Sequence, residues 1–354
     1  MYIKSPMYES ELNEYISEFS SVFEKTENTA VAITGAAGLI GNYIVDLLMQ
    51  SGKTRVIAVD RDSERMNERF GDYYGNDNFV PLIGDVNDAV FCESIFAGRE
   101  VTYLIHAASN TSPLDYANKP VDTICTNIIA THNLLECVRK FGVRRFMFCS
   151  SVEAYGTGSD DVEFFDESYS GYVDCNTLRA GYPSGKRASE AMCNAYAGEY
   201  GVDFVTVRIG RIYGPTVIKG DTKAPTQFIS NAVKNEDIVM KSPGTQVFSF
   251  GYVGDCASGM LKVLTEGESG NAYNVADSEG GIMLRDFASA AASASGKEVV
   301  FDLTVDLAKA GYSKVTRAVL STEKLESLGW KALHNHKDGT KRTVDYLKEM
   351  KIFS

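Results

Sequence analysis

One short stretch near the start of the chain constrains its fold more than any other feature. An apolar run, AVAIT at residues 30–34, leads into TGAAGLIG at residues 34–41, and a helical pattern follows. A buried strand, a glycine-rich turn and a helix, in this order, begin a βαβ unit. Gly35 permits the tight turn, Gly38 lets the backbone approach a pyrophosphate at the helix N-terminus, and Gly41 allows close packing of helix on strand.

Apolar runs of strand length recur along the chain, and helical patterns separate them. Five more follow the first, at residues 54–60, 79–85, 101–109, 144–151 and 202–210. Nearly continuous apolar runs that alternate with helices indicate a parallel sheet covered on both faces. The predicted fold class is therefore α/β, a Rossmann-type doubly wound parallel sheet with a smaller C-terminal substrate-binding lobe.

The patterns divide the chain into three predicted parts. Residues 1–28 form an N-terminal helical extension. One amphipathic helix is expected over residues 8–25, packed on the body or on a partner, because apolar side chains recur with helical spacing at Leu12, Tyr15, Ile16, Phe19, Val22 and Phe23. Residues 29–210, with about 246–276, form the dinucleotide-binding Rossmann domain. Residues 211–245 and 277–354, where the alternation weakens, form the substrate-binding lobe.

Composition excludes some partners and compartments. The 354-residue chain has 35 Lys and Arg against 47 Asp and Glu, a net charge of −12. Such an acidic surface argues against nucleic acid, whose binding needs concentrated positive charge. No apolar stretch is long enough for a membrane span, and the N-terminus lacks the pattern of a secretory signal. Seven scattered cysteines without a CxxC pair indicate free thiols and a cytoplasmic location.

An acidic residue at the end of the second apolar run defines the expected cofactor. Asp60 ends VIAVD, and a carboxylate there accepts hydrogen bonds from ribose hydroxyls and repels a 2′-phosphate. NAD is therefore favoured over NADP, although the adjacent Arg61 is a residue that can welcome such a phosphate. Asp85 and Val86 are expected near the adenine, with an ordinary helix cap as the alternative role of Asp85.

A tyrosine and a lysine supply the proposed chemistry. Tyr182 and Lys186 in YPSGK lie about one helical turn apart, so both side chains share a face. A phenol has a pKa of about 10, which must fall by roughly 3, or about 4 kcal/mol, before it acts as a base near neutrality. A neighbouring ammonium and a positive nicotinamide ring favour the phenolate. Ser151 is expected to hydrogen-bond the reacting oxygen.

With both motifs present, the sequence resembles the extended short-chain dehydrogenase/reductase family, in its NAD-dependent epimerase/dehydratase group. The resemblance covers roughly residues 29–345 and rests on TGAAGLIG, HAAS, SSVEAYG, YPSGK, RIGRIYGP and SFGYVGD. The chain looks nearest to nucleotide-sugar 4,6-dehydratases and UDP-glucuronate decarboxylases. It implies NAD contacts from Gly35, Gly38, Leu39, Ile40, Gly41, Asp60, Arg61, Asp85, Val86, Ala107, Ala108, Ser109, Asn127, Tyr182 and Lys186.

The resemblance implies a reaction that starts with oxidation of a nucleotide-linked sugar. Tyr182 takes the proton of the C4 hydroxyl while hydride passes to NAD. The 4-ketone makes the C5 hydrogen acidic and turns a C5 carboxylate into a β-keto acid. Glu153 matches a glutamate that acts next to C5 in both subfamilies; a solvated loop acid is the alternative. Elimination or decarboxylation then precedes return of the hydride, so NAD is regenerated. The catalytic set is Ser151, Glu153, Tyr182 and Lys186.

Several positions depart from these subfamilies. Val152 stands where the dehydratases have aspartate and the decarboxylases a small hydroxyl residue, so a standard 4,6-dehydratase is disfavoured. Arg179 matches an arginine that the decarboxylases carry before the tyrosine. Arg211 replaces a usual asparagine, and Phe248 replaces an arginine that grips the diphosphate. Arg211 is therefore expected to contact phosphate or carboxylate, with a surface salt bridge as the alternative. Thr111 completes the predicted substrate-binding set.

Three classes of function stay open from the sequence. The first is nucleotide-sugar modification through a C4 ketone, by a dehydratase- or decarboxylase-like lyase or by a 4-epimerase. The second is a simple sugar oxidoreductase, and the third is an NAD-binding sensor without catalysis. No metal is expected, because His334 and His336 do not share a helix face. The resemblance implies a homodimer built from the helix with Tyr182 and the helix at 121–140.

Overall fold

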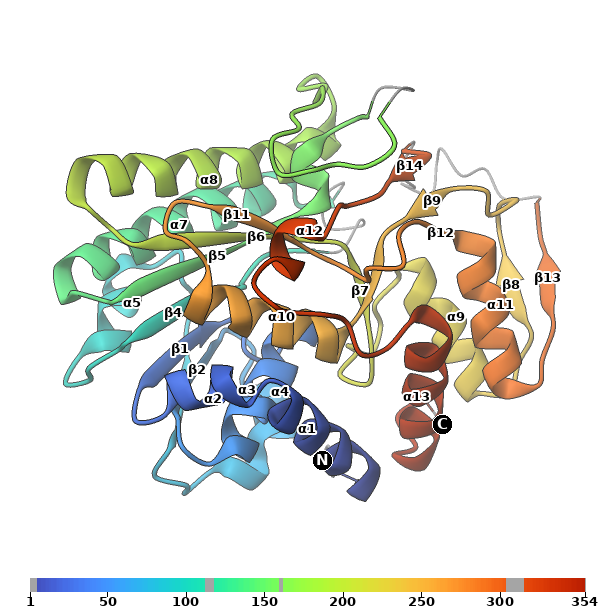
Figure 1. The fold of residues 1–354 in the computed structure, drawn as a ribbon, viewed down its shortest axis with the longest axis horizontal. Helices are drawn as coiled ribbons and strands as arrows, with labels where there is room; N and C mark the ends of the chain where they lie inside the picture. Colours follow the sequence, from blue (N-terminus) through green and yellow to red (C-terminus); the bar gives the residue numbers. More distant parts are fainter. Residues whose placement is uncertain (1–4, 112–117, 159–161, 304–314, 354) are drawn as a thin grey trace.

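A seven-stranded, fully parallel sheet forms the centre of the molecule (Figure 1). The computed structural model describes residues 5–111, 118–158, 162–303 and 315–353. In sheet order the strands are β11 (Ala272–Val275), β6 (Phe204–Ile209), β5 (Arg145–Ser151), β4 (Tyr103–His106), β1 (Ala30–Thr34), β2 (Arg55–Asp60) and β3 (Phe79–Ile83). All six predicted strands are present, and the predicted Rossmann-type class is confirmed.

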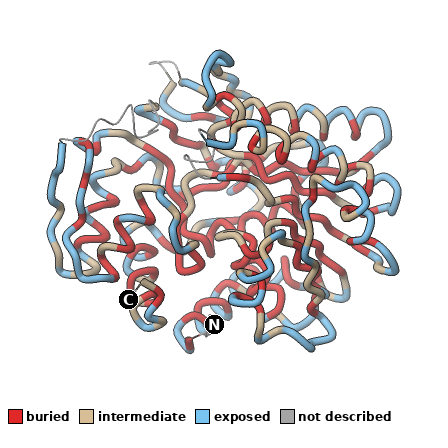
Figure 2. Tube along the Cα trace, turned by 180° about the vertical axis from the view of Figure 1, so that it is seen from behind, coloured by how far each residue is buried: buried red, intermediate tan, exposed pale blue. Residues whose placement is uncertain are grey.

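Helices cover both faces of this sheet, as a doubly wound fold requires. In β5, Phe146 and Phe148 face one apolar core, whereas Met147 and Cys149 face the other, because successive side chains point to opposite faces. The first core includes side chains of α5 (Ala89–Phe96), α7 (Pro120–Phe141) and α8 (Gly181–Tyr200). The second includes α3 (Leu39–Ser51), α4 (Ser63–Phe70) and α10 (Val253–Glu266). Figure 2 shows the sheet and the inner sides of these helices as the most buried part of the chain.

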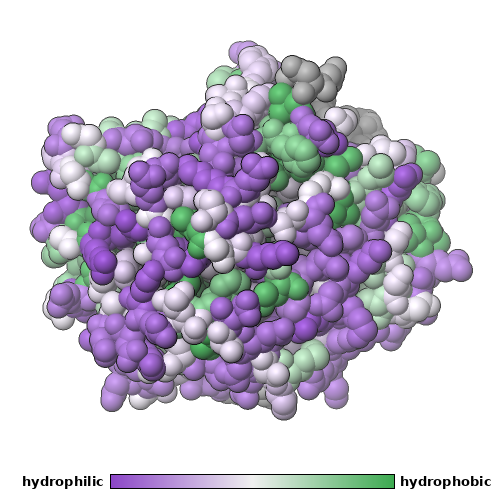
Figure 3. Space-filling model, viewed as in Figure 1, coloured by the Kyte–Doolittle hydropathy of each residue, from purple (hydrophilic) through white to green (hydrophobic). Residues whose placement is uncertain are grey.

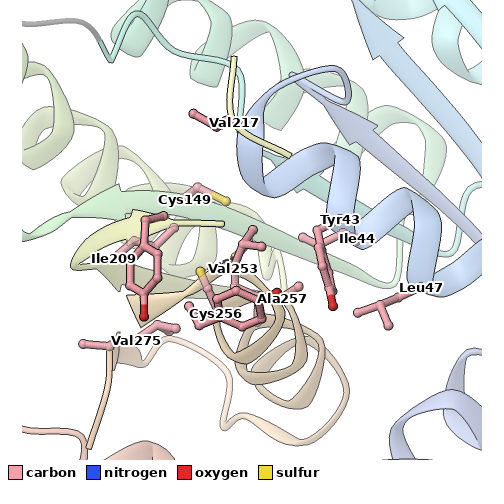
Figure 4. Close-up of a cluster of buried hydrophobic side chains, with 14 of the residues drawn as sticks. Tyr43, Ile44, Leu47, Cys149, Ile209, Val217, Val253, Cys256, Ala257 and Val275 are labelled. Atoms are coloured by element: carbon pink, nitrogen blue, oxygen red, sulfur yellow. Dashed lines mark hydrogen bonds between the residues drawn. The ribbon is translucent and has the colours of Figure 1, made fainter. Parts of the chain in front are cut away.

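Side chains near the carboxyl end of β5 pack into the second core. Figure 4 shows Cys149 of β5 above Val253 and Cys256 of α10, with Tyr43 and Ile44 of α3 beside them. All five side chains belong to one cluster of buried residues. This packing holds the carboxyl end of β5 in a fixed position relative to α3.

A smaller group of elements lies beside the sheet (Figure 1). Within the described residues, it contains three short sheets and three helices. The sheets pair β7 (Arg211–Tyr213) with β10 (Phe250–Tyr252), β9 (Val247–Phe248) with β12 (Ile282–Met283) and β14 (Arg317–Ala318), and β8 (Ile238–Met240) with β13 (Val299–Phe301). The helices are α9 (Ala224–Val233), α11 (Leu284–Ser295) and α13 (His336–Glu349), whereas the short α12 (Glu323–Glu326) lies against the large sheet.

The predicted division into domains stays a prediction, although one segment of the predicted lobe returns to the large sheet. Helix α12 lies against β11. Trp330 is buried and donates a hydrogen bond from Nε1 to Ser258 Oγ on α10, at 3.0 Å. The last part of the chain therefore contacts both groups of elements.

One face of the molecule is mostly polar. Figure 3 shows hydrophilic residues over most of the face seen there, with scattered apolar residues between them. Within the part of the chain that the structure describes, none of the helices combines the length and the apolar character that crossing a bilayer requires.

The N-terminal extension packs on the body of the protein, as expected, but it is not one helix. It forms α1 (Pro6–Glu18) and α2 (Ser20–Thr26), and Phe19 between them leaves helical geometry with φ −105° and ψ 36°. Helix α1 lies against α3 and α10, and Tyr8, Leu12 and Tyr15 are buried there. The extension therefore supports α3, the helix that begins at the glycine-rich turn.

A buried glutamate joins α1 to three other segments. Glu11 is 6% exposed, and its Oε1 accepts hydrogen bonds from the hydroxyls of Tyr43 (2.6 Å) and Tyr252 (2.7 Å). Its Oε2 lies 3.4 Å from Nη1 of Arg342 on α13. One carboxylate thus satisfies groups from α3, the end of β10 and α13.

Glu11→Ala is expected to lower the free energy of unfolding by about 2–4 kcal/mol, because two buried hydroxyls lose their acceptor and Arg342 loses one of its carboxylate partners. The midpoint of urea denaturation, followed by circular dichroism, measures this loss. Glu14→Ala is the matched control: Glu14 lies on the same helix, 3.7 Å from Arg342, but is 47% exposed. Exposed pairs contribute about 0–1 kcal/mol. Equal losses in both variants would contradict the role given to Glu11.

Candidate active site

The glycine-rich turn lies at the point where the order of the sheet reverses. Strand β1 pairs with β2 on one side and β4 on the other, and the crevice beyond this point is where open α/β sheets bind ligands. Gly35 has φ +71°, and a Cβ there would lie 2.8 Å from the backbone nitrogen of Ala108. A Cβ at Gly41 would collide with the Gly35 carbonyl oxygen. Gly38 precedes α3 as its N-cap, with Leu39 and Ile40 half-buried in the first turn.

Asp60 binds the glycine-rich turn itself. Its Oδ2 accepts a hydrogen bond from the backbone nitrogen of Ala37 at 3.0 Å, and its Oδ1 accepts one from that of Asp62 at 3.1 Å. A carboxylate has about four acceptor positions, so both oxygens keep capacity for ribose hydroxyls. The residue that sequence predicted as the ribose ligand therefore also fixes the turn.

Asp60→Ala is expected to weaken NAD binding by about 10- to 100-fold, the cost of one or two hydrogen bonds to a charged group. NADP is expected to lose less, because its 2′-phosphate no longer meets a negative charge. Titration calorimetry with both dinucleotides measures the two affinities. Asp62→Ala serves as the control, since Asp62 caps α4 by accepting from Arg65. An unchanged preference in Asp60→Ala would assign selectivity to Arg61.

The other predicted cofactor residues lie along the same edge of the sheet. Ala107, Ala108 and Ser109 follow β4, and Ser109 Oγ donates to Oδ1 of the buried Asn127 on α7 at 3.0 Å. Val86 is buried, whereas Asp85 is exposed and accepts from the backbone nitrogen of Asn87 at 2.9 Å. The cap of α5 is Asp88, so the alternative role suggested for Asp85 belongs to another residue.

Tyr182 and Lys186 begin α8 and are held against the end of β5. They are 5% and 3% exposed, and Lys186 Nζ lies 5.7 Å from the centre of the Tyr182 ring. The ammonium donates a hydrogen bond to the carbonyl oxygen of Cys149 at 2.7 Å. Cys149 precedes Ser151 by two residues on β5, so this bond positions the tyrosine and the serine relative to each other. Ser151 Oγ accepts from the Glu153 backbone nitrogen at 3.2 Å.

Burial lowers the pKa of Lys186 to about 8, because an ammonium loses hydration inside the protein. The lysine is therefore charged below that pH and loses its charge above it. We expect kcat/KM to fall as the pH rises through about 8, since a neutral amine no longer favours the tyrosine phenolate. A pH–rate profile of the purified enzyme measures this. A value that stays constant up to pH about 10 would contradict this role of the ammonium.

Glu153 lies between the tyrosine helix and a cation. It belongs to the short helix η2 (Val152–Tyr155), which packs against α8, and its Oε2 lies 4.0 Å from Nη2 of Arg179 in η3 (Leu178–Ala180). The Glu153 side chain is 27% exposed, whereas Val152 is buried. The glutamate is therefore partly enclosed and paired, which favours a role in the site over a solvated loop acid.

Arg211 and Phe248 form a stacked pair. The guanidinium carbon of Arg211 on β7 lies 3.7 Å from the centre of the Phe248 ring on β9. The family resemblance expects an arginine at position 248. The guanidinium of Arg211, from another strand, lies over the phenylalanine that stands there.

Three contacts near the site were not foreseen from the sequence. Lys223 Nζ donates to Oγ of the exposed Thr111 at 3.4 Å, although the two lie far apart in the chain and neither belongs to a periodic pattern. Arg61 donates to Asn110 at 3.0 Å. Thr34 Oγ lies 2.8 Å from Nδ1 of His106, and its position at the end of the first apolar run was the only available signal.

His106 of the HAAS motif is a buried, neutral residue. His106 is 1% exposed, and burial and the positive charge of Lys186 lower its pKa to about 3, so its ring is neutral.

His336 lies in a group with Asp277 and Glu279 whose possible ligand atoms are within 4.8 Å of one another. The acids come from a segment distant in sequence, which is why spacing did not reveal them. The expectation that the protein needs no metal stays a prediction.

The sheet order, the glycine-rich turn and the buried Tyr–Lys pair define a Rossmann-type short-chain dehydrogenase/reductase. Residues 31–276 match the model of the NAD dependent epimerase/dehydratase family, and the chain belongs to that family. The family predicted from sequence and the expected cofactor, NAD, are thus confirmed.

Curated and solved relatives agree with this assignment. UDP-glucuronic acid decarboxylase 6 of Arabidopsis thaliana is 33% identical over 248 residues, which cover 70% of this chain and 69% of that protein. The UDP-glucose 4-epimerase of Thermotoga maritima, solved with UDP-glucose, has a TM-score of 0.78 at 25% identity and covers 91% of this chain and 99% of its own. The Thermus thermophilus UDP-glucose 4-epimerase, solved with NAD, has a TM-score of 0.75 at 26% identity and covers 90% and 99%.

Proposed function

We propose that this enzyme decarboxylates a nucleotide-linked uronic acid through transient oxidation at C4. The observation that carries the proposal is the buried Tyr182–Lys186 pair, held by the Cys149 carbonyl beside Ser151 and the partly enclosed Glu153. The similarity to UDP-glucuronic acid decarboxylases supports the choice of substrate. NAD, when bound in the switch-point crevice, supplies a hydride acceptor that returns the hydride later in the same turnover.

Each catalytic side chain has one task in this proposal. Tyr182 accepts the proton of the C4 hydroxyl as that carbon loses its hydride, and Ser151 donates a hydrogen bond to the developing carbonyl oxygen. Lys186 favours the phenolate. The C4 ketone lets the bond between C5 and the carboxylate break with release of carbon dioxide, and the electron pair of that bond forms an enolate. Glu153 then delivers to C5 a proton that it has taken up from solvent. Tyr182 returns its proton to the oxygen when C4 is reduced.

Two arginines and one lysine carry the positive charges that we match to the substrate's negative charges. Arg179 lies beside Glu153, Arg211 is stacked on Phe248, and Lys223 reaches Thr111. Guanidinium groups suit both carboxylate and diphosphate because they offer paired donors. We assign Arg179 to the sugar carboxylate and Arg211 to the diphosphate.

A second function is supported by one observation. Val152 is 7% exposed and carries no group that could protonate a leaving hydroxyl, and a 4-epimerase needs none. The solved UDP-glucose 4-epimerases are similar in fold over almost their whole length. A 4,6-dehydratase is disfavoured by the same valine.

Mass spectrometry of a substrate panel tests the proposal. The enzyme is incubated with UDP-glucuronate and with UDP-, dTDP-, CDP- and GDP-glucose. We expect UDP-glucuronate to lose the mass of carbon dioxide without net NADH. An isomer of unchanged mass would instead establish a 4-epimerase, and steady accumulation of NADH would establish a simple oxidoreductase.

We further propose a homodimer in a reducing compartment such as the cytoplasm. Apolar side chains are exposed on α7 and beside α8, with Val121 72%, Ile129 42% and Leu178 66% exposed, and a second copy of this face would cover them. The proposal of a reducing compartment is supported by the seven cysteines, all of which are free, including the exposed Cys175. Sedimentation velocity of the full chain is expected to give the dimer mass; a monomer at micromolar concentration would contradict this.

A further inference from the structure

A side-chain bridge spans the crevice in which the dinucleotide is expected. In the sheet, β1 lies between β2 and β4, and the glycine-rich turn follows β1. Arg61 directly follows β2, and Asn110 lies in the loop after β4. Arg61 Nη2 donates a hydrogen bond to Asn110 Oδ1 at 3.0 Å. This contact therefore joins the two sides of the crevice across the turn that meets the pyrophosphate.

The acceptor in this bridge is held in one orientation. Asn110 is 7% exposed, and its Nδ2 donates to Oδ2 of Asp122 at 2.7 Å. Asp122 only accepts and Arg61 only donates, so the amide has a single arrangement that satisfies both. Asp122 lies in the first turn of α7, where the helix dipole favours a negative charge. Both outer groups are charged, which strengthens both hydrogen bonds.

We propose that Arg61, Asn110 and Asp122 form a clasp that closes over bound NAD and slows its release. A slow release suits the proposed function, on which this inference rests, because there the hydride returns to the sugar and the dinucleotide need not leave between turnovers. Arg61 and Asn110 act on NAD by enclosing it, and Asp122 is a positioning residue that acts through Asn110.

The clasp also resolves the two roles open to Arg61. An arginine next to Asp60 would favour a 2′-phosphate if its guanidinium pointed to the ribose. The guanidinium is instead committed to Asn110. The clasp therefore reserves Arg61 for retention and leaves Asp60 to select NAD over NADP.

Dissociation of a dinucleotide tests the clasp without any sugar substrate. The enzyme is loaded with NADH and mixed with excess NAD in a stopped-flow instrument, and the loss of bound-NADH fluorescence gives the dissociation rate. Arg61→Ala and Asn110→Ala are each expected to raise this rate about tenfold, the value of one partly exposed charge-assisted hydrogen bond. The double variant is expected to release NADH no faster than either single variant, because one contact is lost in all three.

Arg65→Ala is the matched control. Arg65 lies four residues beyond Arg61, is 34% exposed in its side chain and pairs with Asp62. Its loss removes the same charge but not the clasp, so wild-type release is expected. Arg61 is exposed, so the Arg61→Ala enzyme is expected to fold. A rate of NADH release from this variant equal to that of wild type would overturn the proposal. Effects that multiply in the double variant would overturn it as well.

NADP binding provides a readout that a merely structural role would not change. The Asn110→Ala variant keeps Arg61 but removes its partner in the clasp. The affinity of this variant for NADP is therefore expected to rise above that of the wild-type enzyme. Arg61→Ala is expected to show no such gain. An Asn110→Ala enzyme without improved NADP binding would overturn the reservation of Arg61. Wild-type enzyme that holds no dinucleotide would instead refute the cofactor site itself.

Discussion

Tyr182→Phe is expected to lower kcat by about 10³-fold or more while NAD affinity stays close to that of wild type. The phenol is the group proposed to take the C4 proton, and loss of a positioned general base costs about 10²–10⁴-fold. Phenylalanine fills the same buried space, and Lys186 keeps its bond to the Cys149 carbonyl. Product formation by mass spectrometry and NAD titration by calorimetry separate the two effects.

Tyr196→Phe is the control for this experiment. Tyr196 lies on the same helix and is also buried, but its hydroxyl donates to Glu136 at 2.6 Å and contacts His132, away from the end of β5. Its removal is expected to leave kcat near the wild-type value. Turnover by Tyr182→Phe that matches Tyr196→Phe would withdraw the assignment of the base.

The predictable part of the fold was the part that depends on local pattern. The six apolar runs became six strands, and in all of them except the edge strand β3, which is only partly buried, most side chains are buried on both faces of the sheet. Such runs are recognised without knowledge of distant partners. The seventh strand, β11, was missed because AYNV is short and contains Asn274. That side chain is buried only because Tyr155 donates to it and the carbonyls of Phe165 and Ser321 accept from it.

The break in the N-terminal helix was also invisible. The apolar spacing continues from α1 into α2 without interruption, so periodicity predicted one helix over residues 8–25. Phe19 departs from helical geometry and is itself buried in the core. Neither proline nor glycine lies near this point, so the sequence carries no local signal of the break.

In the candidate site, spacing predicted which residues share an element and could not predict contacts between elements. Tyr182 and Lys186 were paired by helical spacing, whereas the contacts of Arg211 with Phe248 and of Arg61 with Asn110 join separate strands and loops. Long side chains reach such partners through rotamers that the sequence does not specify. The arginines of the site were therefore identified, whereas Lys223 and the contacts between these side chains were not.

Glu153→Gln is expected to lower product formation by about 10²–10³-fold without preventing the first hydride transfer. Glutamine has nearly the same size and keeps an oxygen on the side of Arg179, whose Nη2 lies 4.0 Å from the native carboxylate. It cannot take up and deliver a proton at C5. In a single turnover, NADH and a 4-keto sugar are therefore expected to accumulate, which absorbance and mass spectrometry detect.

Glu163→Gln is the control, because Glu163 is a 74% exposed acid that follows the same motif in the chain. It is expected to behave as wild type. If Glu153→Gln also forms product at the wild-type rate, the glutamate is only a loop residue beside Arg179. If it instead blocks NADH formation as Tyr182→Phe does, Glu153 acts in the oxidation step itself. Only accumulation of the ketone assigns Glu153 to the chemistry at C5 and not to the oxidation step.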